Sequence, residues 1–166
     1  HLYRWYVVAL ALIVFGVLFI FVENRNKKKT PTVNSISEIT YKQALIIGVW
    51  QLIAAVFPGT SRSGSTIIGA LLLGISRKTA AEFTFYLAVP VMFGASLLKI
   101  AKFGFAFTGA QLAVLIVGML VSYIVSVIVI KSLLGYIKKH DFKAFGWYRI
   151  VLGIIVILYF ILSPAA

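Results

Sequence analysis

The sequence predicts an all-α membrane protein, and three observations support this fold class. Hydrophobic residues make up 61% of the 166 residues, against roughly 45 to 50% in soluble domains, and the mean hydropathy is +1.03. Several apolar runs reach the length of about 20 residues that a helix needs to cross a bilayer. Two shorter apolar stretches flank a polar loop, Pro58 to Thr66. Together these features predict about four transmembrane helices plus one re-entrant helical hairpin, in a single membrane domain over residues 1–166.

The first predicted span runs from about Leu2 to Val22, and a polar, cationic linker follows over residues 23–43. The positive-inside rule places this linker in the cytoplasm. The apolar stretches Ala44–Phe57 and Thr66–Ile75 come next. As helices they would be about 21 Å and 15 Å long, too short for a hydrocarbon core of about 30 Å. We therefore expect a re-entrant hairpin over residues 44–75, with its polar tip buried in protein or lining a wet cavity.

Three further spans complete the predicted topology: Thr79–Ile100, with a kink at Pro90; Leu112–Ile130; and Phe145–Leu162. The connections are an outside loop, Lys99–Gln111, and a basic cytoplasmic loop, Lys131–Lys143. This topology puts most of the cations on the cytoplasmic side, as the positive-inside rule requires. A straight crossing through residues 44–75 would reverse that sidedness.

The formal net charge of +12 and the absence of cysteine limit the function classes. The cations lie in short segments beside apolar spans, where orientation and anionic lipid headgroups account for them, so nucleic-acid binding is not expected. Without cysteine the chain has no disulfide, no thiolate nucleophile and no Cys-ligated metal.

The polar loop carries the chemistry that we expect of an anion site. Gly59 and Gly64 permit backbone angles that let successive N–H groups converge on one anion. A helix beginning near Ser65 or Thr66 would direct its positive end at the same place. Arg62 offers a planar, bidentate fork to a phosphate. The hydroxyl donors are Thr60, Ser61, Ser63, Ser65 and Thr66, and Gln51 is expected to hydrogen-bond to the loop.

Several alternatives stay open on the residues alone. Arg62 could line a water-filled vestibule or pair with Glu82, with the small residues serving helix packing. Glu82 could orient Arg62, hold a metal or complement a helix dipole. A Walker A loop is rejected, because Ser65 stands where lysine is needed and no strand precedes it. His140 is expected to be a solvated surface residue.

The segment PGTSRSGSTI, with YKQA before it, ISRKTAAEFTFYLAVPVM after it and YRI near Tyr148, resembles the bacterial undecaprenyl-diphosphate phosphatases, the bacitracin-resistance proteins. The resemblance covers nearly the whole chain. It implies a multi-pass enzyme of the bacterial plasma membrane, with two inverted repeats, that removes the terminal phosphate of undecaprenyl diphosphate and recycles the lipid carrier of peptidoglycan synthesis. A homodimer is compatible with it.

By the same resemblance, Arg62, Ser61 and Thr66 are the catalytic residues. The expected substrate-binding residues are Gly59, Thr60, Ser63, Gly64, Ser65 and Gln51. The family also implies a divalent cation, Mg²⁺ or Ca²⁺, held by glutamates of a first repeat that also supplies a histidine. No such glutamate-rich stretch occurs here, so no metal ligand is expected in this chain.

The chain thus resembles the second half of such an enzyme, and we expect it to bind phosphate weakly alone without turnover. Whether water, a hydroxyl or the histidine is the nucleophile stays open. The alternative function is a transporter or flippase of a lipid phosphate or small anion, since paired re-entrant hairpins also occur in secondary transporters. Phosphate release by reconstituted vesicles would separate the two.

Overall fold

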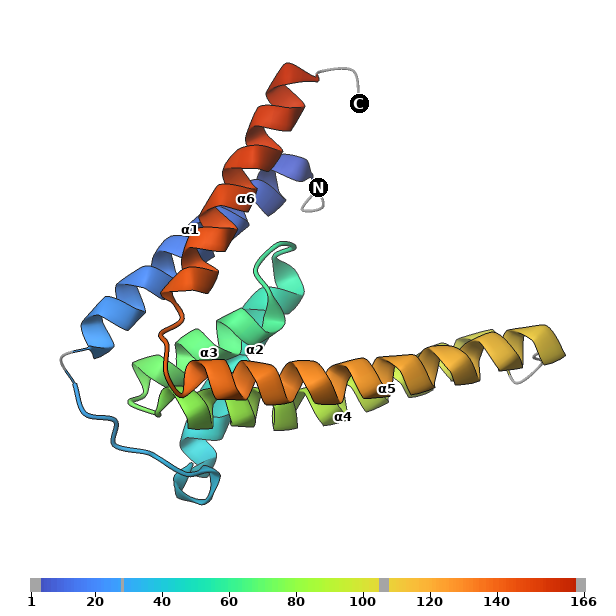
Figure 1. The fold of residues 1–166 in the computed structure, drawn as a ribbon, viewed down its shortest axis with the longest axis horizontal. Helices are drawn as coiled ribbons and strands as arrows, with labels where there is room; N and C mark the ends of the chain where they lie inside the picture. The colour runs from blue at the N-terminus through green and yellow to red at the C-terminus, as the bar shows by residue number, and fades with distance from the viewer. Residues whose placement is uncertain (1–3, 28, 105–107, 164–166) are drawn as a thin grey trace.

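The computed structural model describes residues 4–27, 29–104 and 108–163, and within them it confirms the all-α class (Figure 1). The helices are α1 (Trp5–Asn26), α2 (Tyr41–Val56), α3 (Arg62–Leu72), α4 (Arg77–Phe103), α5 (Gly109–Ile137) and α6 (Lys143–Leu162), with a short 3-10 helix, η1 (Ile36–Glu38), in the linker. Four of them, α1, α4, α5 and α6, are long and apolar enough to cross a membrane. These four correspond to the four predicted spans.

The predicted boundaries of these spans need correction, because the helices extend past their apolar stretches. α1 continues to Asn26 rather than Val22, α4 to Phe103 rather than Ile100, and α5 to Ile137 rather than Ile130. The linker and both loops are correspondingly shorter than predicted. Residues with long cationic side chains can remain in a helix at a membrane boundary, because their charged ends reach out to water. A helix can therefore be longer than its apolar stretch. The predicted start at Leu2 lies outside the described residues.

α1 and α6 pack side by side as an antiparallel pair (Figure 1), and small residues bring their backbones together. A Cβ added at Gly16 would lie 2.8 Å from the carbonyl oxygen of Gly146, and one added at Gly153 would lie 3.0 Å from that of Ala9. At the far end of the pair, the Trp5 and Phe160 rings stack with centroids 4.9 Å apart. Close approach through small residues is the usual way in which membrane helices gain packing energy.

The helices α2 and α3 form the predicted helical hairpin, and the loop between them lies beside α1. Gly69 of α3 permits the close contact, because a Cβ there would lie 2.6 Å from Cγ of Trp50 on α2. Trp50 is therefore a packing residue. α3 is the most buried helix, with every described residue from Gly64 to Leu71 inside the core.

A buried ion pair joins three segments at the base of the fold, the end away from the hairpin loop. Glu23 at the end of α1 is fully buried. Its carboxylate accepts from Arg77 Nη2 at 2.6 Å and from the Phe142 N–H at 3.2 Å. Arg77 begins α4 and Phe142 precedes α6, so one carboxylate fixes the ends of three candidate membrane-spanning helices relative to one another. The linker is attached nearby by a parallel bridge between Val33 and Ile75.

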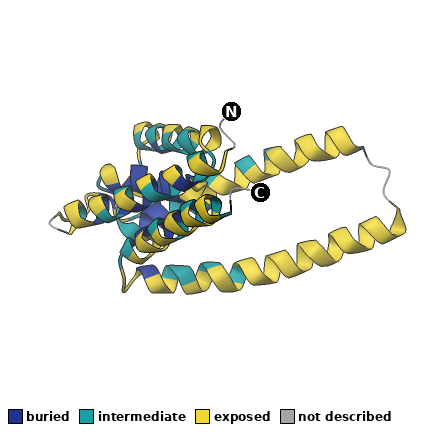
Figure 2. Ribbon diagram, turned by 90° about the horizontal axis from the view of Figure 1, so that it is seen from above, coloured by how far each residue is buried: buried dark blue, intermediate teal, exposed yellow. Residues whose placement is uncertain are grey.

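The helices α4 and α5 leave this core as a largely exposed pair (Figure 2). α5 is buried only at Ile137, its last residue, and α4 only near its start, from Thr79 to Thr84. The remaining apolar surface of both helices faces outward. Its composition suits a hydrocarbon environment.

Candidate anion-binding site

The loop between α2 and α3 takes a conformation that few residues can adopt. Gly59 has φ = 91° and Ser61 has φ = 42°. A Cβ at Gly59 would lie 2.7 Å from the carbonyl oxygen of Val8, so the position requires glycine for space as well as for conformation. Ser61 is the only described non-glycine residue with positive φ. Such strain persists only where the surroundings hold it, and it is frequent at functional sites.

α3 begins at Arg62, and the predicted start near Ser65 or Thr66 is therefore wrong. The Ser61 hydroxyl caps the helix by accepting from the Gly64 N–H at 3.2 Å. The cap moves the start one turn earlier, because it satisfies an N–H group that the first turn leaves free. Arg62 and Ser63 thus occupy the first turn, and their own N–H groups have no acceptor among the described residues. These are the donors that an anion at a helix N-terminus uses.

The loop hydroxyls divide into an exposed and a buried group. Ser61 and Ser63 are exposed, as is Arg62 between them, and the two serine hydroxyls lie 3.2 Å apart. Thr60, Ser65 and Thr66 are buried. Only the exposed group can meet a ligand directly in this conformation.

The buried hydroxyls hold the hairpin together. Ser65 Oγ donates to the carbonyl oxygen of Trp50 across the two hairpin helices. Thr66 Oγ1 lies 2.9 Å from Thr84 Oγ1 on α4, and Thr60 Oγ1 donates to the Phe57 carbonyl at 2.7 Å. Each of these buried hydroxyls thus has a hydrogen-bond partner within the protein. The roles in substrate binding and catalysis that the resemblance implies for them stay predictions.

Arg62 has no carboxylate partner among the described residues. The open alternative, an ion pair with Glu82, is not formed, because Glu82 pairs with Lys78 at 3.6 Å. The Arg62 guanidinium makes only a weak contact, 3.9 Å from Nη2 to Sδ of Met92 on α4. Gln51 likewise makes no hydrogen bond to the loop in the described part of the chain. An exposed, unpaired guanidinium beside free N–H groups is available to an anion.

A second arginine, which was not among the predicted site residues, lies under the loop. Arg149 of α6 is 9% exposed, and its Nη2 donates to the Gly59 carbonyl at 2.7 Å. A Cβ at Gly64 would lie 3.2 Å from its Nη1. Its buried Nε has no partner in the described residues. An arginine inside an apolar span is itself a signal of function, and that signal was available in the sequence.

The candidate site therefore contains two guanidinium groups, one from the loop and one from α6, and no acid. All four acidic residues are engaged elsewhere: Glu23 with Arg77, Glu38 with the Asn34 N–H, Glu82 with Lys78, and Asp141 with Lys27. No group of three or more metal-ligating side chains occurs among the described residues. His140 lies at the other end of the fold, exposed and stacked on Tyr136. The local charge favours an anion, and the donors present here do not fit a divalent cation.

Comparison with known proteins gives consistent similarities. Residues 1–155 match the family model described as bacitracin resistance protein BacA. The chain is 66% identical over 158 residues to an undecaprenyl-diphosphatase from Desulfitobacterium hafniense, covering 95% of this chain and 57% of that protein. It is 63% identical over 158 residues to one from Enterococcus faecalis, with the same two coverages. The chain thus spans less than two thirds of the length of these relatives.

Proposed function

The chain belongs to the BacA family of bacitracin resistance proteins, and from this membership we propose that it forms part of a membrane phosphatase. The enzyme would hydrolyse undecaprenyl diphosphate to undecaprenyl phosphate and inorganic phosphate in the bacterial plasma membrane. The relatives named above are undecaprenyl-diphosphatases. The hairpin would be re-entrant, within the second of two inverted repeats.

One observation carries the proposal: Arg62 is exposed and unpaired in the first turn of α3. The terminal phosphate of the substrate would bind there, with its oxygens on the guanidinium fork and on the free N–H groups of Arg62 and Ser63. The hydroxyls of Ser61 and Ser63 lie beside these donors. As the phosphoryl group transfers, its charge is spread over the equatorial oxygens, and a fixed cation stabilises that state.

The residues under the loop would position this exposed group. Arg149 holds the Gly59 carbonyl and adds a second positive charge behind the site. Ser65 and Thr66 tie α3 to α2 and α4. We propose that Thr66 acts on catalysis through this positioning. The divalent cation that the family implies would take its ligands from residues outside this chain, because the acids here are engaged elsewhere.

The test is phosphate release from undecaprenyl diphosphate by the intact protein carrying Arg62→Ala or Arg62→Lys. Removing one preformed charge donor costs about 10²- to 10³-fold in kcat, so we expect at least a 100-fold loss for Arg62→Ala. Arg62→Lys should recover a fraction only, since an ammonium group cannot form the bidentate contact. Lys42→Ala is the matched control, because Lys42 is also exposed near the start of a hairpin helix.

Three results would count against the proposal. Near-normal turnover by Arg62→Ala would remove the role assigned to that side chain. Labelled lipid that crosses vesicles without phosphate release would favour the transporter. Metal-dependent turnover by these 166 residues alone would show that no further residues are required.

A further inference from the structure

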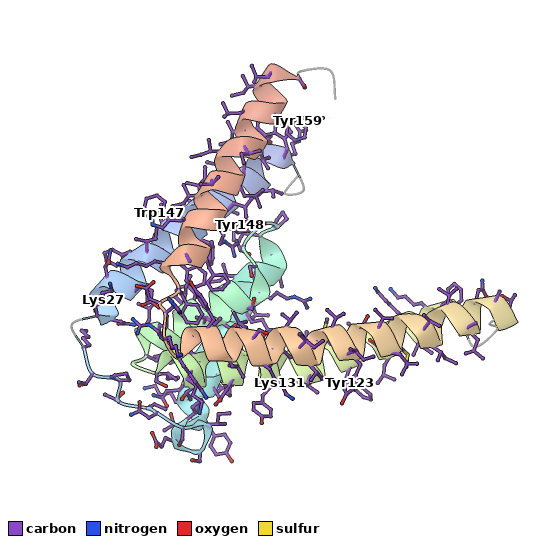
Figure 3. The ribbon with its side chains drawn as sticks, viewed as in Figure 1. Lys27, Tyr123, Lys131, Trp147, Tyr148 and Tyr159 are labelled. Carbon is purple, nitrogen blue, oxygen red and sulfur yellow. The ribbon has the colours of Figure 1, made fainter. Side chains whose placement is uncertain are left out.

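We propose that a basic cavity at the base of the fold binds the phosphate headgroup of an anionic phospholipid. The cavity has a volume of about 910 Å³ and lies between the end of α1, the turn from α3 to α4 and the end of α5. Figure 3 shows Lys27 at this end of α1. The cations that line it include Arg25, Lys27, Lys29, Lys138 and Lys139.

The charge of this cavity is only partly neutralised. Lys27 pairs with Asp141 at 3.5 Å. Arg25, Lys29, Lys138 and Lys139 have no carboxylate within ion-pair distance among the described residues. The ends of α1, α3 and α5 meet here, and their helix dipoles account for part of this cationic charge. The C-terminal ends of these three helices carry about half a negative charge each. The four unpaired cationic side chains carry more charge than that, so an excess of positive charge remains for a ligand.

The walls and the position favour a lipid over a soluble anion. Leu72 and Leu73 line the cavity together with the cations, and Leu72 is 40% exposed. The cavity opens where three candidate membrane spans, α1, α4 and α5, end or begin. Its volume far exceeds that of one phosphate ion and suits a headgroup with its glycerol. Basic pockets between spanning helices are a recognised type of anionic-lipid site.

This cavity is separate from the anion-binding loop. It lies at the end of α3 opposite Arg62, and the 11 residues of that helix span about 16 Å. None of the exposed loop residues lines it. The inference therefore does not rest on the proposed phosphatase activity, and each can fail alone.

The test compares lipid retention in native mass spectrometry of the intact protein, released from micelles that contain equal amounts of dioleoyl phosphatidylglycerol and dioleoyl phosphatidylcholine. The pocket variant is Lys138→Gln/Lys139→Gln, in which both side chains are exposed. The matched control is Lys99→Gln/Lys102→Gln, which removes two exposed charges at the other end of α4. Each cation near an anionic surface contributes about fivefold at low ionic strength. We expect the preference for phosphatidylglycerol to fall roughly 25-fold in the pocket variant only.

Helical circular dichroism and thermal unfolding should stay unchanged in both variants, which confirms that they fold. If the lysine variant fails that check, Arg25→Gln/Lys29→Gln takes its place. Equal losses in the pocket and control variants would overturn the proposal, because the effect would then be general charge attraction. Displacement of phosphatidylglycerol by millimolar inorganic phosphate would also overturn it and assign the cavity to a soluble anion. So would the absence of any preference in the unmodified protein.

Discussion

Glu23→Gln should destabilise the fold far more than the same change at Glu82, a half-buried glutamate. The Glu23 carboxylate is fully buried and accepts from Arg77 Nε, Arg77 Nη2 and the Phe142 N–H. The amide retains one acceptor oxygen but removes the charge and turns an NH₂ group toward a guanidinium. Hydrogen bonds to charged groups contribute about 1.5 to 3 kcal/mol each, and breaking a buried pair costs about 3 to 5 kcal/mol.

The Arg77 side chain is 36% exposed, so it can regain water when its partner is lost. This lowers the expected cost to about 3 kcal/mol, or roughly 150-fold in the unfolding equilibrium. Arg77→Gln should cost more, because it leaves a buried carboxylate without its cation. The double variant should cost less than the sum of the two, with a coupling of at least about 1.5 kcal/mol.

The assay is unfolding in mixed micelles with increasing denaturing detergent, followed by helical circular dichroism. Glu82→Gln is the control, since that carboxylate is 27% exposed and pairs with Lys78 at 3.6 Å. Pairs of this kind contribute about 0 to 1 kcal/mol. A Glu23→Gln variant as stable as Glu82→Gln, or a coupling below about 0.5 kcal/mol, would refute the role of this pair in joining the helices.

Three further predictions concern the hairpin and the linker. Gly59→Ala should cost about 3 kcal/mol and abolish turnover, because it combines positive φ with a Cβ placed 2.7 Å from the Val8 carbonyl oxygen; unchanged thermal unfolding would contradict the loop geometry. Ser65→Ala should cost about 1 kcal/mol of stability with less than tenfold loss of turnover, because its hydroxyl bonds the hairpin internally; a 100-fold loss of turnover in a stable variant would indicate direct contact with substrate. The Asn34 N–H donates to Glu38 and holds the pKa of that carboxyl below its ordinary value. The hydrogen bond should therefore persist at neutral pH and be lost as the pH falls through the lowered pKa. Its loss would be measured as faster hydrogen exchange of the Asn34 amide, after correction for the intrinsic exchange rate at each pH. Protection of that amide that rises on acidification would contradict the prediction.

The sequence by itself determined the class of the fold and pointed to the loop that we propose as the site. Apolar runs that are long enough to cross a bilayer predict spanning helices, because in hydrocarbon the backbone N–H and C=O groups can hydrogen-bond only to one another. The same argument identified the hairpin, since two short apolar stretches around PGTSRSGST cannot each cross. Arg62 was predicted to be a site residue because a charge within an apolar region is costly and usually marks a function.

The tertiary structure decided which of the loop residues face outward and what lies beneath them. Five hydroxyls look alike in the sequence, but only Ser61 and Ser63 are exposed, because contacts with Trp50 and Thr84 bury two others. Arg149 lies 90 residues from Gly59 along the chain, and only the packing of α6 beside α1 brings them together. Local patterns report helix periodicity and hydrophobicity, whereas a contact between distant residues depends on how whole helices pack.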